Sequence, residues 1–253
     1  LAMNYTDQDL PKFFLNHKEY SVSINEQPKS IPDYGHKKLR IAYLSGDFKR
    51  HSVPYFIEGL LHFHDRQKFE VYCYSDVANG DLITERFQEL SDHWREIFDK
   101  SHDQVTQMIK QDEIDILIDL AAHTGQRLQV FANRSAPVQI TYCGYPNTSG
   151  LQNMGYRLVD ELTDPDGDEF YTEKLIRLNR CFLAFSPPDD APETVEPPMM
   201  KNGYITFGSF NNFTKVNDQV LKTWRQILKS IPNSRLLLKS KHFNDSDFKK
   251  ETR

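Results

Sequence analysis

The fold of this chain is decided by residues 39–52, which read LRIAYLSGDFKRHS. The apolar run Leu39–Phe48 predicts a buried β-strand, because buried parallel strands are hydrophobic almost without interruption. The polar turn Ser45–Ser52 comes next and leads into Ser52–His64, where apolar residues recur at helical spacing. A strand, a polar turn and a helix in this order predict the first unit of an α/β fold.

The same alternation continues downstream. Further apolar runs predict strands at Phe69–Val77, Trp94–Phe98, Ile114–Ala122 and Val138–Gly144. Amphipathic stretches between them predict helices at Leu82–Leu90, His102–Gln111 and Gln126–Asn133. Strands that alternate with helices predict a parallel sheet covered on both faces, which is the doubly wound, Rossmann-like arrangement.

A proline-rich segment, residues 186–203, separates this sheet from the C-terminal residues and is expected to hold no regular element. After it, Tyr204–Phe210 and Ser234–Lys239 predict strands around a helix at Asp218–Ser230. A single βαβ unit cannot cover both faces of its own sheet, so we expect it to begin a second Rossmann-like lobe.

The N-terminal residues predict an amphipathic helix within residues 1–25 and a linker at 26–38. The run Phe248–Arg253 predicts the middle of a further helix, so we expect the chain to be a fragment of a longer protein. The predicted domains are a helical segment with its linker, a first catalytic lobe, a proline-rich linker and the start of a second, nucleotide-binding lobe, at residues 1–38, 39–185, 186–203 and 204–253.

Composition excludes several classes of function. The formal net charge is −5, so bulk electrostatics disfavour binding to nucleic acid or to an anionic membrane. No stretch approaches the roughly 20 apolar residues of a membrane span, and no signal-peptide pattern is present. The cysteines, Cys73, Cys143 and Cys181, form no CxxC pair and predict buried free thiols rather than zinc ligands. We expect a cytoplasmic protein, also nuclear if its source is eukaryotic.

Polar groups gather in the turns that end the predicted strands. His51 lies in the first turn, at or just before the predicted helix, where the helix dipole favours a neutral ring that accepts a proton. In the alternative interpretation, Ser52 or Asp47 caps that helix and His51 only packs there. His123 and Thr124 come directly after a later strand, and the turn Gly144–Gly150 comes after the next.

Because the carboxyl ends of parallel strands meet at one edge of a sheet, we expect His51, His123 and Tyr145 to cluster there. In the second lobe, Lys215 precedes a predicted helix and is able to meet a diphosphate as a point charge, although a solvated lysine without a role explains this residue better when it is taken alone.

Together these turns carry a resemblance to a known family. The motifs are Leu1–Tyr5, Asp47–Phe48, His51–Val53, Tyr55–Phe56, His123–Gly125, Ala136–Gln139, Gly144–Thr148, Thr206–Asn212 with Lys215, and Ile231–Arg235. In this order, over nearly the whole chain, they resemble the catalytic region of the O-GlcNAc transferase/SPINDLY family, and the SPINDLY branch more closely.

The resemblance implies a two-lobed GT-B glycosyltransferase, usually preceded by tetratricopeptide repeats, that moves a sugar from a nucleotide donor to Ser or Thr hydroxyls of proteins. It implies inversion at the sugar carbon and no metal or other cofactor. His51 then lies at the reaction centre as a base or positioning group, and Lys215 meets the donor diphosphate. The resemblance assigns donor and acceptor binding to Ser52, His123, Thr124, Gly144, Tyr145, Pro146, Thr148, Asn211 and Asn212.

Two departures from the family pattern bear on mechanism. Animal O-GlcNAc transferases carry a further active-site histidine where this chain, like the SPINDLY branch, has Asn4. Most of the nucleotide-binding lobe lies beyond Arg253, so we expect residues 1–253 alone to be inactive. The donor stays open between UDP-GlcNAc and GDP-fucose. Two other classes of function also stay open: a catalytically silent scaffold, and a module that binds glycans or nucleotide sugars.

Overall fold

The computed structural model describes residues 10–24, 33–188 and 190–244. The chain divides into two compact units, and the division falls at residues 189 and 190, inside the predicted proline-rich linker. Asn4, the run Phe248–Arg253 and most of the predicted linker at 26–38 lie outside the described residues.

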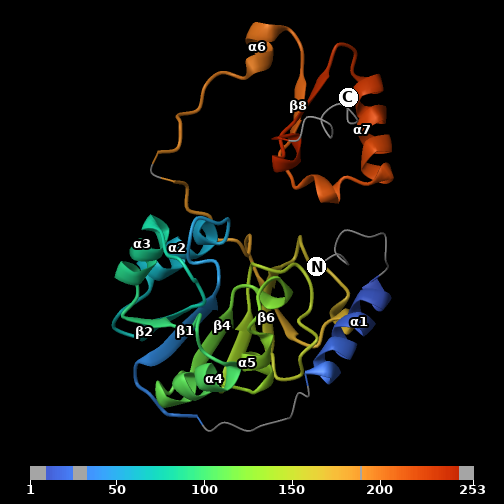
Figure 1. Ribbon diagram of the computed structural model, residues 1–253. Coiled ribbons are helices and arrows are strands. Elements are labelled where there is room, and N and C mark those ends of the chain that lie inside the picture. Colours follow the sequence, from blue (N-terminus) through green and yellow to red (C-terminus); the bar gives the residue numbers. More distant parts are fainter. Residues whose placement is uncertain (1–9, 25–32, 189, 245–253) are drawn as a thin grey trace. The chain divides into compact units, whose positions relative to one another are not determined.

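The first unit is built on a single parallel sheet of seven strands in the order β3-β2-β1-β4-β5-β6-β7 (Figure 1). The strands are β1 (Leu39–Ser45), β2 (Phe69–Ser75), β3 (His93–Glu96), β4 (Ile116–Asp119), β5 (Val138–Thr141), β6 (Tyr156–Asp160) and β7 (Lys174–Leu178). The order runs outward from β1 in one direction and then from β4 in the other, so β1 and β4 flank the switch point of a doubly wound sheet. The predicted fold class is confirmed.

Helices pack on both faces of this sheet. They are α2 (Pro54–Phe63), α3 (Leu82–Leu90), α4 (His102–Gln111) and α5 (Leu128–Ala132), and α1 (Leu10–Ser23) precedes the sheet in the chain. Both α3 and α4 begin at capping boxes, in which the side chains of Asp81 and Ser101 accept N–H groups of the first turn. These two helices have the bounds that the sequence predicts.

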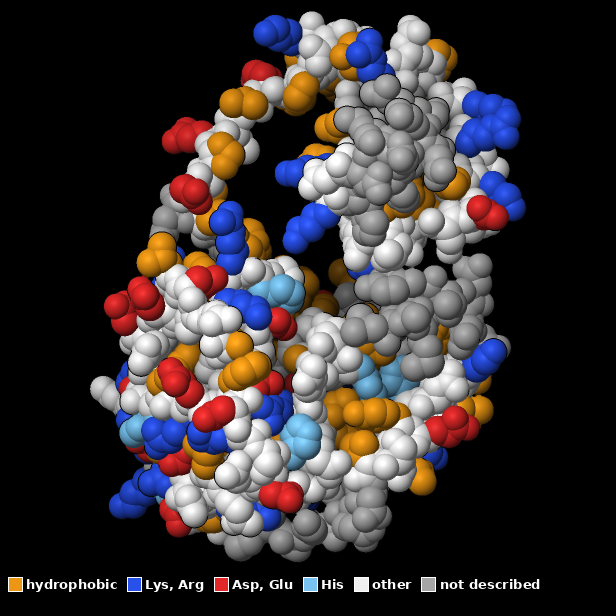
Figure 2. All heavy atoms as spheres, in the orientation of Figure 1, with side chains coloured by type: hydrophobic (Ala, Val, Ile, Leu, Met, Phe, Trp, Pro, Cys, Tyr) orange, Lys and Arg blue, Asp and Glu red, His pale blue; other side chains and the backbone are white. Residues whose placement is uncertain are grey.

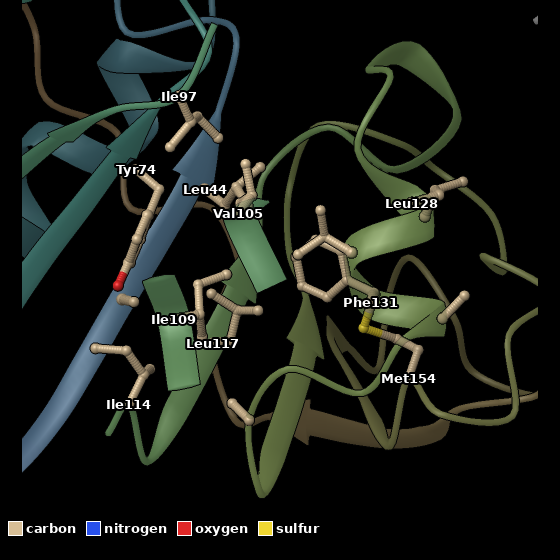
Figure 3. Packing of buried hydrophobic residues seen from close by; sticks show 14 of the residues in the cluster. Leu44, Tyr74, Ile97, Val105, Ile109, Ile114, Leu117, Leu128, Phe131 and Met154 are labelled. Carbon is tan, nitrogen blue, oxygen red and sulfur yellow. The ribbon is translucent and has the colours of Figure 1, made fainter. Parts of the chain in front are cut away.

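The core consists of two layers, one on each face of the sheet. On β1, Ala42 and Leu44 belong to the layer that contains α4 and α5, whereas Ile41 and Tyr43 belong to the layer that contains α2 and α3. Figure 3 shows the first of these layers. Successive strand residues point to opposite faces, so an unbroken apolar run is what a sheet covered on both sides requires.

Several details differ from the sequence-based expectations. The strands β6 and β7 were not predicted at all. The five strands predicted for the first unit are shorter than expected, mainly because residues at their C-terminal ends belong to the turns. The expected start of α2 at Ser52 is wrong: the helix begins at Pro54, whose missing N–H suits the first helical position. Cys181 was expected to be buried but is exposed, because it lies beyond the end of β7.

The described part of the second unit, residues 190–244, contains one parallel strand pair, β8 (Thr206–Ser209) and β9 (Arg235–Leu238), with α7 (Asp218–Ser230) between them in the chain. A short helix, α6 (Pro198–Asn202), begins inside the proline-rich segment that was expected to hold none. Proline at the first helical position and Gly203 in the left-handed conformation after the last one explain it. None of residues 190–244 with described burial is fully buried, and Leu237 is 52% exposed.

Candidate functional site

The turn after β1 is anchored to α3 and its capping residue, and its tip is exposed. Phe48 is fully buried and packs on Phe87, while Thr84 of α3 donates a hydrogen bond to the Phe48 carbonyl. The Arg50 N–H donates to the Asp81 carboxylate, the same group that caps α3. These contacts fix the backbone of the turn from the core side.

The tip of this turn exposes the two predicted site residues, His51 and Ser52. The His51 side chain is 46% exposed, and its Nδ1 lies 3.6 Å from an Asp47 carboxylate oxygen and 3.4 Å from the Val53 amide nitrogen. Neither Ser52 nor Asp47 caps α2: the capping residue is Val53, which makes no side-chain cap. The expected capping of α2 by Ser52 or Asp47 is therefore wrong, whereas the interpretation that His51 only packs in its turn stays open. Among the described residues, none bonds Nε2 of His51.

A pocket of about 250 Å³ opens at the switch point, between the carboxyl ends of β1 and β4. The β1 turn contributes Gly46, Asp47 and Lys49, and the β4 turn contributes Thr124. Open α/β sheets bind their ligands at this position. Of the predicted site residues, the structure therefore brings Thr124 next to the turn that carries His51.

Two charged residues that the sequence analysis missed also line this pocket, the buried Asp119 and the partly buried Arg127. Asp119, at the end of β4, accepts the N–H groups of Ala121 and Ala122, and burial raises its pKa to about 6 in spite of those bonds. Arg127 forms an ion pair with Asp76 at 2.6 Å. A buried Asp directly after an apolar strand is the signal that could have identified the first group.

His123 in the turn after β4 and Tyr145 in the turn after β5 are covered, unlike His51 in the β1 turn. His123 and Tyr145 have ring centroids 5.1 Å apart, and His17 of α1 lies 4.7 Å from His123. The His123 Nε2 bonds the Ser149 carbonyl at 2.8 Å, so this nitrogen carries the ring proton. Burial and the neighbouring His17 lower the pKa of His123 to about 4. The ring is neutral at physiological pH.

The predicted cluster at the carboxyl edge therefore forms only in part. His123 and Tyr145 are in contact, whereas the contacts of His51 lie within its own turn. The signal for His17 was weak, because a lone histidine in an amphipathic helix is usually a surface residue.

The turn Gly144–Gly150 is held by side chains from two other parts of the chain. A carboxylate next to β7, Glu173, accepts the Thr148 hydroxyl at 2.6 Å and the Ser149 N–H at 2.7 Å. Arg157 of β6 donates to the Asn147 carbonyl. Tyr145 and Thr148 are fully buried, so this turn presents the exposed Pro146 and its backbone to solvent.

Close approach and strain mark these covered turns. A Cβ at Gly144 would lie 1.8 Å from the Leu120 carbonyl oxygen, so only glycine fits there. Ala122 and Cys143, which directly precede His123 and Gly144, have positive φ angles of 42° and 56°. Strained non-glycine residues of this kind are concentrated at functional sites.

The remaining predicted residues lie in the second unit, in the turn after β8. Asn211, Asn212 and Lys215 are exposed, and the Asn212 side chain caps the short helical turn Phe213–Lys215 by accepting the Thr214 N–H. Among the described residues, no group of three or more His, Cys, Asp or Glu side chains is arranged to hold a metal ion. The helices of the described part are all too short or too polar to cross a membrane.

Comparison with known proteins places this geometry in a family. Residues 13–186 match the family "Glycosyl transferase family 41". The chain is 39% identical to the probable UDP-N-acetylglucosamine–peptide N-acetylglucosaminyltransferase SPINDLY of Arabidopsis thaliana, across 96% of this chain and 28% of that protein. It is 33% identical to the corresponding protein SEC of the same plant, across 83% of this chain and 23% of that one.

A solved structure, a mutant of the O-GlcNAc transferase of Thermobaculum terrenum, superposes with a TM-score of 0.92 at 34% identity. The superposition covers 98% of this chain and 48% of that structure's chain. The present chain thus spans about a quarter of the plant relatives and about half of the solved one. From the match over its first unit and these relatives, the chain belongs to glycosyl transferase family 41.

Proposed function

We propose that this chain is part of a protein O-glycosyltransferase that transfers a sugar from a nucleotide donor to Ser or Thr hydroxyls, with inversion and without a metal ion. The observation that carries the proposal is the exposed His51 on the turn that also lines the switch-point pocket with Asp47 and Lys49. A family 41 fold with a polar pocket and a solvent-facing imidazole at the carboxyl edge of its sheet suits activation of an acceptor hydroxyl.

In the proposed reaction the acceptor oxygen attacks the anomeric carbon, and the bond from that carbon to the diphosphate oxygen breaks. The nucleoside diphosphate leaves with the electron pair, and the hydroxyl proton passes to the ring of His51. Lys215 stabilises the charge that develops on the diphosphate, which is the role that a metal ion would otherwise fill. Asn211, Asn212 and Ser52 contact the donor or acceptor, as do the turns that contain Thr124 and Gly144.

The donor in this proposal is UDP-GlcNAc or GDP-fucose. The names of the plant relatives favour UDP-GlcNAc. Tetratricopeptide repeats ahead of residue 1 and a cytoplasmic location complete the proposal. Acidic and basic side chains are interspersed over the visible face of the first unit (Figure 2), which suits a protein acceptor better than nucleic acid.

The test uses the full-length protein. A thermal-shift titration with UDP-GlcNAc, GDP-fucose, UDP and GDP identifies the donor, because a ligand at 100 times its Kd adds about 2.7 kcal/mol to stability. Transfer to acceptor protein is then followed by mass spectrometry with and without EDTA, and the product anomer is read by NMR. We expect transfer in EDTA. Donor binding without transfer would instead support a silent scaffold or a sugar-nucleotide-binding module.

A further inference from the structure

The helix α1 contributes a fully buried histidine to the covered turns. Phe13, His17 and Ser21 recur at four-residue spacing along α1, and all three are buried. This stripe is the face that α1 presents to the first unit. A buried histidine needs partners for both ring nitrogens, and His17 has them.

The two partners of His17 determine which nitrogen carries its proton. Nδ1 lies 2.5 Å from the Phe13 carbonyl oxygen, which can only accept, so the proton is on Nδ1. Nε2 then has a lone pair and accepts the hydroxyl of Tyr145 at 2.8 Å. Burial lowers the pKa of His17, which keeps the ring in this neutral form.

The same helix also touches the other end of the turn. Gly150 has a positive φ of 78°, and a Cβ there would lie 2.2 Å from the His17 carbonyl oxygen. Tyr20, one helical turn further along α1, packs its ring 5.0 Å from the ring of His123. The sheet elements hold the middle of the turn through Glu173 and Arg157, whereas α1 holds Tyr145 and Gly150 at its ends.

We propose that His17 is a positioning residue: by accepting the Tyr145 hydroxyl it locks the turn Gly144–Gly150 against α1 and so sets the position of a surface that lines the donor sugar. The inference rests on the proposed function only for the last step. The restraint that His17 places on the turn Gly144–Gly150 can be measured without any enzymatic reaction.

Two substitutions at His17 separate its two bonds. In His17→Gln, the side-chain oxygen reaches the place of Nε2 and still accepts from Tyr145. In His17→Asn, the amide reaches only the place of Nδ1, so the Phe13 bond is kept and the Tyr145 bond is lost. Tyr145→Phe removes the same bond from the other side. Tyr142→Phe is the matched control, because Tyr142 is also a buried residue but its hydroxyl donates to the Phe182 carbonyl.

The experiment measures hydrogen exchange and kinetics in the full-length protein. Tyr145→Phe and His17→Asn should speed exchange of the Ser149, Gly150 and Leu151 amides about 10-fold and lower kcat/KM for the donor about 10-fold, as small misplacements do. The acceptor KM should stay within twofold. His17→Gln and Tyr142→Phe should match wild type, and the double variant Tyr145→Phe with His17→Asn should be no worse than either alone.

Three outcomes overturn the proposal. Unchanged exchange in Tyr145→Phe, or an equal change in Tyr142→Phe, would mean that the bond does not lock the turn. Faster exchange with an unchanged kcat/KM for the donor would mean that the bond restrains the turn but does not position a surface for the donor. If wild-type protein transfers no sugar from any donor, the proposed function fails, and the exchange measurement still decides whether α1 holds the turn.

Discussion

The turn after β1 and the turns after β4 and β5 lie at the same edge of one sheet, yet their histidines have opposite environments. The His51 side chain is 46% exposed and, among the described residues, contacts its own turn, whereas His123 packs against His17 of α1 and its Nε2 bonds a carbonyl oxygen. The difference comes from α1, whose His17 and Tyr20 pack against His123. A position at the carboxyl edge of the sheet therefore predicts a functional site. Whether a side chain there is free to meet a substrate or instead holds a turn in place depends on the element that packs over it.

The largest effect is expected from a substitution in the exposed turn after β1. In the full-length enzyme, His51→Ala should lower kcat by roughly 100-fold to 10,000-fold, because general base catalysis contributes that much. Tm and donor affinity should hardly change, since the side chain is exposed. Steady-state kinetics and thermal melts measure both. His62→Ala, another exposed histidine, is the control. A fall in Tm together with donor binding would make His51 a structural residue.

A substitution in the turn after β5 should instead lower the stability of the folded protein. Gly144→Ala places a methyl group 1.8 Å from backbone oxygen, which cannot move aside, so we expect a loss of about 3 kcal/mol or more in the free energy of unfolding. Gly46→Ala in the open turn is the matched control, because its Cβ would lie at an ordinary 3.5 Å from the Asp76 carbonyl. Urea denaturation compares the two. Equal losses of unfolding free energy in the two variants would contradict the proposed difference between the two turns.

A third prediction extends the comparison to the open turn of the second unit. Lys215→Ala should lower kcat about 100-fold, the usual effect of removing one electrostatic stabiliser from a developing charge. Folding should be unaffected because Lys215 is exposed. Lys222→Ala on the surface of α7 serves as the control. Wild-type rates in Lys215→Ala would show that another group stabilises the departing diphosphate.

The smallest expected effect is a pH dependence of the covered turn. The pKa of His123 is about 4 in the folded protein and about 6.5 when unfolded. Between these values the unfolded state binds the extra proton, so stability falls as pH falls. From pH 7 to pH 5 the loss is about 2 kcal/mol for this group.

The matched variant is His123→Gln, which retains a donor for the Ser149 carbonyl but does not titrate. Chemical denaturation at pH 7 and pH 5 should show a smaller loss in the variant. Asp119, whose pKa is raised to about 6, changes stability in the opposite direction, but it does so equally in both proteins. An identical pH dependence would mean that His123 is accessible to protons when folded.

The sequence predicted the parts of the fold in which local pattern and tertiary environment agree. The strands β1 and β2 are buried on both faces, so their apolar runs were unambiguous. The strands β6 and β7 escaped notice because charged residues interrupt them: Arg157 is buried within β6, and Lys174 and Arg177 belong to β7. Strands near the edge of a sheet have less need of an apolar pattern.

Within the candidate site, the sequence located the turns but not the groups that support them. His51, His123 and Tyr145 were identifiable because polar residues directly after apolar strands stand out. His17 and Glu173 were not, since their importance depends on contacts across 128 and 24 residues of chain. Such long-range pairings leave no local trace in composition or spacing.

The separation of His17 from Tyr145 also orders events during synthesis. At 5–20 residues per second, a ribosome needs roughly 6–26 s to add the 128 residues that lead from one to the other. Until then α1 has no turn to cover. Its buried stripe, which includes Phe13, must stay in solution or rest on another protein. The covered turns are therefore among the last parts of the first unit to be completed.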